Sequence, residues 1–444
     1  MNNIQNIQKA NQLITLLVLL LVLSLSTSWA KTEVLSSGEV KLTKEEKKLL
    51  EETAIFEEEI NRKGLIYHDQ ILGDYVNEIG EELISNVNIP AIKFRFQIIK
   101  DPTLNAFALP NGSIYIHSGI LSQLENEAQL AHILGHEITH VIQRHAVKAY
   151  KDFKGKLMLA NIVDILGSAA VVGADISYLN FFSIGLGLTM SAAINGYGRE
   201  NEKEADDIGM GLMVDAGYQI EEVPKVYELL LKEYGDATNL EVFFMGSHPA
   251  NKERIKRTTE LLKTKYAGKT QQTALITNME KFQQRTKILI RENAVLNIRA
   301  DRYHHAIAGL EKVIKSDPKD PIAHYYLGEA HRLIVKYPEK TKEEEEEKRT
   351  TQKPKKKEMT PEEKEEKLSI SLREYNLALS QDSQYPEPHR GLGLVYWEQG
   401  KEEQSIDEFE KYLTLYPMAK DRRQIGKYLE ELKNKKEEGK NEVK

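Results

Sequence analysis

Near the end of its first third, the chain reads Asn126-Glu-Ala-Gln-Leu-Ala-His-Ile-Leu-Gly-His-Glu-Ile-Thr-His-Val-Ile-Gln-Arg-His145. This stretch lacks proline and is rich in helix-forming residues, so it predicts a helix. Residues four apart lie on one helical face, about 6 Å apart along the axis. The imidazoles of His136 and His140 can therefore bind one zinc ion, and Glu137 can act on water at that ion. The alternative is an amphipathic core helix with incidental histidines, because short motifs also match by chance.

A zinc site of this kind needs a third protein ligand, and a later acidic stretch offers one. It reads Arg199-Glu-Asn-Glu-Lys-Glu-Ala-Asp-Asp-Ile-Gly209 and places Glu202 and Asp206 on one helical face. Glu202 can bind the metal, while Asp206 can accept the free N–H of a ligating histidine. The alternative is a solvent-exposed acidic helix end, which is what we expect for Glu200 and Glu204.

Four motifs, taken together, resemble those of a known family. They are Asn105-Ala-Phe-Ala-Leu-Pro-Asn-Gly112, His136-Glu-Ile-Thr-His140 with Arg144-His145, Arg199-x-x-Glu-x-Glu-Ala-Asp206, and Ser247-His-Pro249. In order and spacing they resemble the HtpX and CAAX-prenyl-protease family of zinc metallopeptidases. The C-terminal repeats described below resemble the periplasmic branch of that family, the β-barrel assembly-enhancing proteases. The chain departs from the family pattern at Gly198 and at His132, where we expect packing rather than metal binding.

The resemblance implies a zinc-dependent endopeptidase with one zinc ion per chain, acting on misfolded outer-membrane proteins. It implies Glu202 as the third ligand, Asp206 as the carboxylate behind a ligating histidine, and Arg199 near the site. The implied partner is the β-barrel assembly machinery. The alternative function is a chaperone-like binding module with a latent or vestigial protease site.

A strand-rich segment precedes the first metal-binding helix. The run Phe94-Arg-Phe-Gln-Ile-Ile99 is rich in β-formers, and the runs Ala106–Leu109 and Ser113–His117 flank the tight-turn sequence Pro110-Asn-Gly112. A strand beside a zinc helix can hold an extended peptide by β-augmentation. The resemblance places this substrate edge at Asn105, Ala106 and Phe107. The alternative is a hairpin that only packs against the helices.

The histidine of the fourth motif has two candidate roles. His248 lies in a short loop-like stretch before the charged helix expected over Asn251–Lys263, and the resemblance places its motif near the active site. A neutral imidazole there can occupy the fourth position on zinc and hold the site latent. The alternative is that His248 only caps or orients the following helix.

The N-terminus predicts export. Lys9 precedes the apolar stretch Leu13–Leu25, and Ser28 and Ala30 are small residues at positions −3 and −1 of a cleavage site. We therefore expect a signal peptide over residues 1–30, cleaved after Ala30, and a periplasmic location. An uncleaved anchor is the alternative, although the apolar core is short for a spanning helix.

A second apolar region lies between the two metal-binding helices. Its segment Ile176–Ile194 has no charged residue and is just long enough to span a bilayer. Because glycines and polar residues interrupt the wider region, we expect 157–194 to be buried or to contact a membrane peripherally. A transmembrane arrangement is the alternative.

The C-terminal part follows the tetratricopeptide pattern of about 34 residues. Gly328 and Gly393 occupy the same position in successive units but lie about 30 residues further apart than one unit. We assign the excess to a charged, mobile insertion over 338–367. Stacked units form a concave surface suited to binding peptides or partners, and a purely structural cap is the alternative. At this groove or on the surface we place five histidines: His304, His305, His324, His331 and His389.

Composition bounds these interpretations. The chain has 444 residues, 41% of them hydrophobic, which suffices for two or three domains. The net charge of −7 does not suggest nucleic-acid binding, and the absence of cysteine excludes disulfides and cysteine ligands. We expect an α+β, mainly helical fold. Its parts are a zincin-type metallopeptidase domain with a small β-sheet over 31–270, a connecting segment over 271–286, a tetratricopeptide α-solenoid over 287–425 and a charged tail over 426–444.

Overall fold

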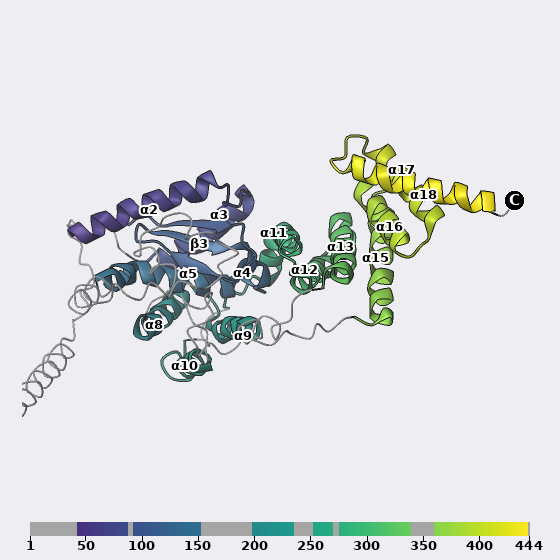
Figure 1. The fold of residues 1–444 in the computed structure, drawn as a ribbon. Helices are drawn as coiled ribbons and strands as arrows, with labels where there is room; N and C mark the ends of the chain where they lie inside the picture. The colour runs from purple at the N-terminus through teal and green to yellow at the C-terminus, as the bar shows by residue number, and fades with distance from the viewer. Residues whose placement is uncertain are drawn as a thin grey trace, which may run out of the picture. The chain divides into compact units, whose positions relative to one another are not determined.

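The computed structural model of the protein describes residues 42–87, 92–151, 198–234, 252–269, 275–338 and 359–442 (Figure 1). The predictions for residues 1–30, for 157–194 and for His248 fall outside these ranges. The N-terminal elements are α2 (Lys44–Arg62), α3 (Gln70–Ile84), β1 (Arg95–Ile99), β2 (Ala106–Ala108), β3 (Ser113–His117), α4 (Ser118–Gln123), α5 (Glu127–Ile142), α8 (Arg199–Asp215), a 3-10 turn (Ile220–Glu222), α9 (Val223–Tyr234) and α10 (Lys252–Lys263). The C-terminal elements are α11 (Met279–Arg299), α12 (Tyr303–Ser316), α13 (Pro321–Lys336), α15 (Pro361–Gln381), α16 (Pro386–Glu398), α17 (Glu402–Leu415) and α18 (Arg422–Glu442).

The three strands form one sheet in the order β1-β3-β2. β2 and β3 pair antiparallel, with Phe107 opposite Tyr115. Gly112 in the turn between them has a φ of 90°, a value that glycine adopts without steric cost. β1 pairs with β3 in parallel, with Arg95 opposite Ser113, an arrangement that the sequence did not predict. This order leaves β2 at one edge of the sheet.

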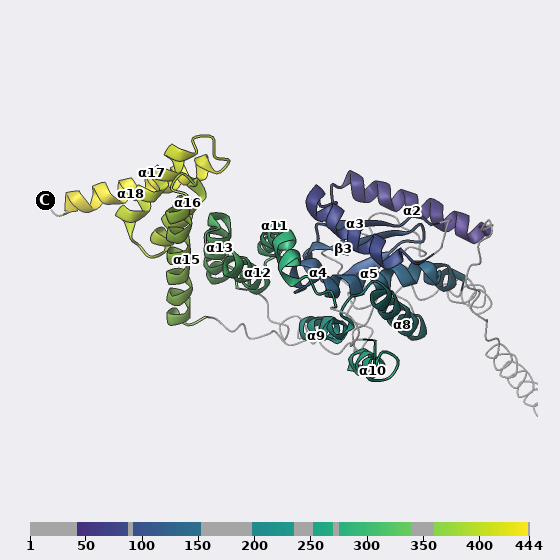
Figure 2. The same cartoon turned by 180° about the vertical axis from the view of Figure 1, so that it is seen from behind.

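Helices cover both faces of this sheet. Successive side chains of a strand point to opposite faces, so Phe107 and Tyr115 pack with Phe56 and Ile60 of α2. The opposite face of the sheet packs with α3 and α5. It carries the side chains of Ala106, Ala108, Ile114 and Ile116. Figures 1 and 2 show α2 and α5 on opposite sides of the strands. The sheet therefore lies between α2 and the helix that carries the histidine motif.

Two glycines bring the backbones of α5 and α8 into contact. A Cβ added at Gly135 would lie 3.1 Å from the carbonyl oxygen of Gly209. A Cβ added at Gly209 would lie 3.0 Å from the carbonyl carbon of Gly135, so neither position has room for a side chain unless its neighbour moves. Gly135 directly precedes His136, and Gly209 follows Glu202 by about two helical turns. The close crossing therefore brings the two predicted metal-binding faces together.

The first C-terminal helix pair is fixed to the N-terminal part by buried polar contacts. Asn293 of α11 accepts a hydrogen bond from Ser118 at 2.8 Å and donates one to Ser122 at 3.0 Å. Lys312 of α12 donates to the carbonyl oxygens of Ser122 and Leu124, at 3.1 and 2.7 Å, where α4 ends. Burial lowers the pKa of the Lys312 ammonium to about 8. The pair α11–α12 thus completes the structure around α4.

The remaining C-terminal helices also pair, α13 with α15 and α16 with α17. The expected fold class, mainly helical with a small sheet, is confirmed. None of the helices in the described ranges is long and apolar enough to cross a membrane.

Two predicted boundaries within the C-terminal part were wrong. The expected boundary between the connecting segment and the repeats at 286/287 falls inside α11. Residues 361–367, assigned to the mobile insertion, form the first two turns of α15. The reason is a capping box, in which Thr360 and Glu363 satisfy each other's backbone N–H groups and Pro361 occupies the first helical turn. The rest of the insertion, 339–358, lies outside the described residues.

The predicted charged tail and two of the histidine placements also need correction. Residues 426–442 continue α18, because Ile425, Leu429 and Leu432 recur at helical spacing and pack with the side chains of α17. His324 and His331 are buried rather than exposed at a groove.

Candidate metal centre

Helices α5 and α8 supply the three candidate ligands. Helix α5 begins after Asn126, whose side chain accepts a hydrogen bond from the third residue of the helix. Its buried residues include His136, Glu137 and His140, so the motif faces the interior. Glu202 stands in the first turn of α8 and is also buried. A buried carboxylate beside two imidazoles needs a compensating charge.

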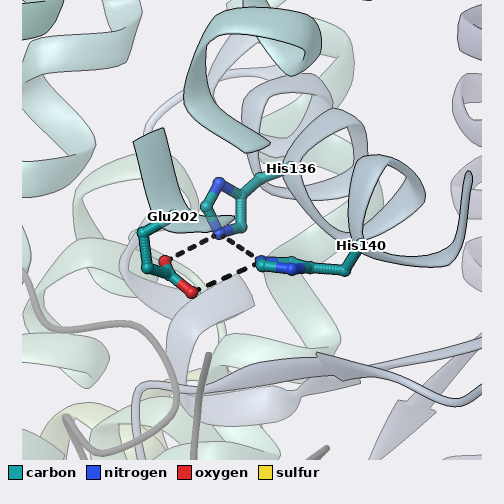
Figure 3. Close-up of side chains that lie close together, drawn as sticks. All are labelled: His136, His140 and Glu202. Carbon is teal, nitrogen blue, oxygen red and sulfur yellow. Dashed lines mark hydrogen bonds and ion pairs between the residues drawn. The ribbon is translucent and has the colours of Figure 1, made fainter. Parts of the chain in front are cut away.

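The three side chains converge on one point, as Figure 3 shows. The Nε2 atoms of His136 and His140 are 3.0 Å apart. The Glu202 carboxylate oxygens lie 3.2 Å from His136 Nε2 and 3.5 Å from His140 Nε2. Two ligands bound to a tetrahedral ion at about 2.0–2.1 Å lie roughly 3.3 Å apart. The donor set therefore fits one metal ion held by two nitrogens and a carboxylate.

The second nitrogen of His136 faces Asp206, as predicted for one of the histidines. His136 Nδ1 lies 3.1 Å from Asp206 Oδ1, which directs Nε2 toward the candidate metal position. Tyr227 of α9 donates a hydrogen bond to the same oxygen at 2.6 Å. His132 Nε2 in turn lies 2.8 Å from the Tyr227 hydroxyl. His132 thus belongs to the packing around Asp206.

An arginine that the sequence did not single out lies among these carboxylates. Arg254 of α10 is buried and contacts Asp206 at 2.5 and 3.1 Å and Glu202 at 3.2 Å. Its guanidinium also lies over the ring of Tyr227, 4.3 Å from the centroid. Arg257, one turn on, reaches Asp206 at 3.1 Å. The sequence signal was weak, because both arginines stand in a charged run that resembles an exposed helix.

The electrostatics of the site favour a cation next to His136. Burial alone lowers the pKa of His136, but hydrogen bonds to Asp206 and Glu202 outweigh it and raise the value to about 9. Burial likewise raises the pKa of Asp206, yet Arg254 and His136 hold that pKa well below its usual range. Asp206 therefore stays ionised and attracts positive charge to the His136 ring. A divalent metal ion at His136 Nε2 can supply this positive charge, as a proton can.

His140 has a different partner behind it. Its Nδ1 lies 2.7 Å from Nδ1 of His145, and His145 Nε2 lies 3.1 Å from Glu204 Oε2. Burial lowers the pKa of His145 to about 4. The expectation that Glu204 is solvent-exposed like Glu200 was wrong, since the Glu204 side chain is only 30% exposed and that of Glu200 is 87% exposed.

The other predicted site residues have separate positions. Glu137 is buried on α5 beside the first histidine. Arg199 opens α8 and is exposed. Asn105 directly precedes β2, and Ala106 and Phe107 lie in it, at the edge of the sheet.

This arrangement is that of a metallopeptidase-type centre. It has two histidines four residues apart on one helix, a glutamate directly after the first, and a glutamate from a second helix. The comparison with known families agrees. The model of peptidase family M48 matches residues 72–262 of this chain.

Curated relatives are similar to part of the chain. The putative β-barrel assembly-enhancing protease of Vibrio cholerae serotype O1 is 31% identical over 202 residues, 44% of this chain and 40% of the relative. The β-barrel assembly-enhancing protease of Escherichia coli K12 is 31% identical over 179 residues, 38% of this chain and 34% of the relative. The mitochondrial metalloendopeptidase OMA1 of Schizosaccharomyces pombe is 29% identical over 197 residues, 44% of this chain and 54% of the relative. The chain thus spans about a third to about half of the length of these relatives.

Proposed function

We propose that the chain is a zinc-dependent endopeptidase in which His136, His140 and Glu202 hold the metal. The observation that carries this proposal is the convergence of their ligand atoms, with separations of 3.0, 3.2 and 3.5 Å. Two imidazoles and one carboxylate form one of the donor sets that catalytic zinc uses, and this set leaves a position open. When bound, zinc lowers the pKa of water and polarises the scissile carbonyl.

The proton transfers are assigned to Glu137. It is buried on α5, next to His136, and its side chain points about 100° away from that histidine on the helical wheel. A carboxylate at this place can take the proton of the attacking water and pass it to the leaving amine. Its burial also keeps bulk water from competing for that proton.

The edge strand β2 supplies a place for an extended substrate. The backbone groups of Asn105 and Leu109 bond to β3. Because these groups alternate in direction along an antiparallel strand, the N–H and C=O groups of Ala106 and Ala108 point away from β3, toward the edge. Ala106 and Ala108 are 5% and 2% exposed, so a peptide that adds to this edge as a further strand must displace the residues that cover it. This mode binds the main chain, so we expect tolerance of many side chains.

The wider role is proposed from the relatives and the predicted export signal. Relatives named β-barrel assembly-enhancing proteases match 44% and 38% of this chain. The C-terminal helices form pairs suited to partner binding. We propose a periplasmic protease that degrades or assists misassembled outer-membrane proteins. In this proposal the repeats recruit clients or the β-barrel assembly machinery. N-terminal sequencing of envelope protein should give Lys31, and recovery of Met1 would contradict the cleaved signal peptide.

The test of the proposed activity uses the purified full chain and its Glu137→Gln variant. The parent should contain one zinc ion per molecule and cleave casein. The variant should keep the zinc and lose hydrolysis by roughly 100-fold or more, because only proton transfer is removed. A Glu137→Gln protein that cleaves as fast as the parent would refute the mechanism. A parent that binds zinc but never cleaves would favour the chaperone-like alternative.

A further inference from the structure

The two candidate histidine ligands are supported by different groups. Behind His136 stands a buried carboxylate, Asp206, at 3.1 Å. Behind His140 stands another imidazole, His145, with Nδ1 facing Nδ1 at 2.7 Å. On the His140 side, the carboxylate lies behind His145. Glu204 Oε2 is 3.1 Å from His145 Nε2.

The proton positions on this second path follow from the chemistry of a ligand. A histidine binds metal through an unprotonated nitrogen, so with Nε2 turned to the metal position His140 carries its proton on Nδ1. A short contact between two ring nitrogens needs one donor and one acceptor. His145 Nδ1 must therefore accept, and its own proton resides on Nε2, where Glu204 accepts it. The reverse orientation would put a proton on His140 Nε2 and block the metal.

The backbone conformation after α5 brings His145 back beside His140. Arg144, just after α5 ends, has a φ of 54°, a left-handed value that is unfavourable for a residue with a side chain. This residue turns the chain before the helical segment 145–151. The turn carries the fully buried His145 ring back to His140, with ring centroids 4.8 Å apart. Strained backbone of this kind persists where the surrounding structure requires it.

We propose that His145 and Glu204 are positioning residues of the metal centre, which hold His140 in the tautomer and orientation that presents Nε2 to the ion. This inference rests on the proposed zinc site. His145 acts as the hydrogen-bond acceptor for His140, and Glu204 fixes the tautomer of His145. Partners behind a ligand typically contribute 10- to 100-fold to metal affinity.

The experiment compares zinc dissociation constants of full-length variants, measured by competition with a chromophoric chelator. His145→Phe keeps a ring but cannot accept a hydrogen bond, so zinc binding should weaken roughly 10- to 100-fold. His145→Gln offers an amide oxygen as acceptor and should stay within about threefold of the parent. The cobalt-substituted proteins should show a changed visible spectrum for His145→Phe and a parent-like one for His145→Gln.

A second pair of variants keeps the test independent of the buried ring. Glu204→Gln, at a partly exposed position, should weaken zinc binding by a smaller factor than His145→Phe, while Glu200→Gln, its exposed neighbour on the same helix, should not weaken it. Equal zinc affinity of His145→Phe and the parent, or equal weakening by Phe and Gln, would overturn the proposal. Casein cleavage by the parent is scored separately, so a zinc-binding but inactive parent counts against the proposed activity and leaves the affinity comparison decisive.

Discussion

Two clusters within the described residues each bury an acidic side chain, an arginine and a tyrosine together. Beside the metal centre they are Asp206, Arg254 and Tyr227. Among the C-terminal helices they are Glu329, Arg332 and Tyr375, where the carboxylate accepts two hydrogen bonds from the arginine, at 3.1 and 2.9 Å, and one from the tyrosine at 2.5 Å.

The two clusters differ in the direction in which the polar atoms in and beside them point. In the C-terminal cluster the donors and acceptors are turned toward one another, and the cluster joins α13 to α15. Beside the cluster of Asp206, Arg254 and Tyr227, the Glu202 carboxylate and two histidine nitrogens are turned toward a common point with metal-ligand spacing. Buried charge alone therefore does not mark a functional site. Convergent ligand atoms beside the buried charge do.

The largest expected effect comes from removing one negative charge at the metal position and one from the C-terminal cluster. Glu202→Gln should abolish zinc binding and peptide hydrolysis, because one of three ligands is lost. Glu329→Gln should keep one zinc ion per chain and the parental rate of casein cleavage, and should lower only the free energy of unfolding. Metal analysis and cleavage assays on both proteins decide this. Loss of zinc from the Glu329 variant would break the comparison.

The next largest effect concerns the arginines. Removing one partner of a buried ion pair typically costs about 3–5 kcal/mol, so Arg254→Met and Arg332→Met should both lower the free energy of unfolding. Zinc supplies positive charge to Glu202, so saturating zinc should reduce the deficit of Arg254→Met. The deficit of Arg332→Met should be the same with and without zinc. Urea unfolding of apo and zinc-loaded proteins measures both, and equal zinc dependence would contradict the assignment.

The smallest effect is a dependence on acid pH in the C-terminal cluster. Burial alone raises the pKa of Glu329, but Arg332 outweighs it and lowers the value to about 2. The stabilisation is thus fully present above the ordinary value of about 4.5 and is lost as the pH falls toward about 2. Between pH 5 and 3 the unfolding free energy of the parent should fall more steeply than that of Glu329→Gln. Parallel pH profiles would show that Glu329 is not held ionised.

The parts that could be predicted from the sequence are those set by local spacing. His136 and His140 share a face because they are four residues apart, and Glu202 and Asp206 do so for the same reason. Helix α18 had a local signal too, Ile425-x-x-x-Leu429-x-x-Leu432, that its charge obscured.

The parts that could not be predicted depend on contacts between distant segments. Arg254 reaches Asp206 only because α10 folds onto α8. Glu204 meets His145 across 59 residues of sequence. The parallel pairing of β1 with β3 likewise depends on how the segment between them crosses, which residue alternation does not reveal.

The contacts of α11 and α12 with α4 determine where the chain can be divided. The family match ends at residue 262, yet a fragment that ended there would leave Ser118 and Ser122 without Asn293, and the end of α4 without Lys312. Exposing that buried face should make the shortened protein prone to aggregation. A fragment that extends to Ser316 keeps all these contacts. We therefore expect the smallest well-behaved peptidase to include the first helix pair of the C-terminal part.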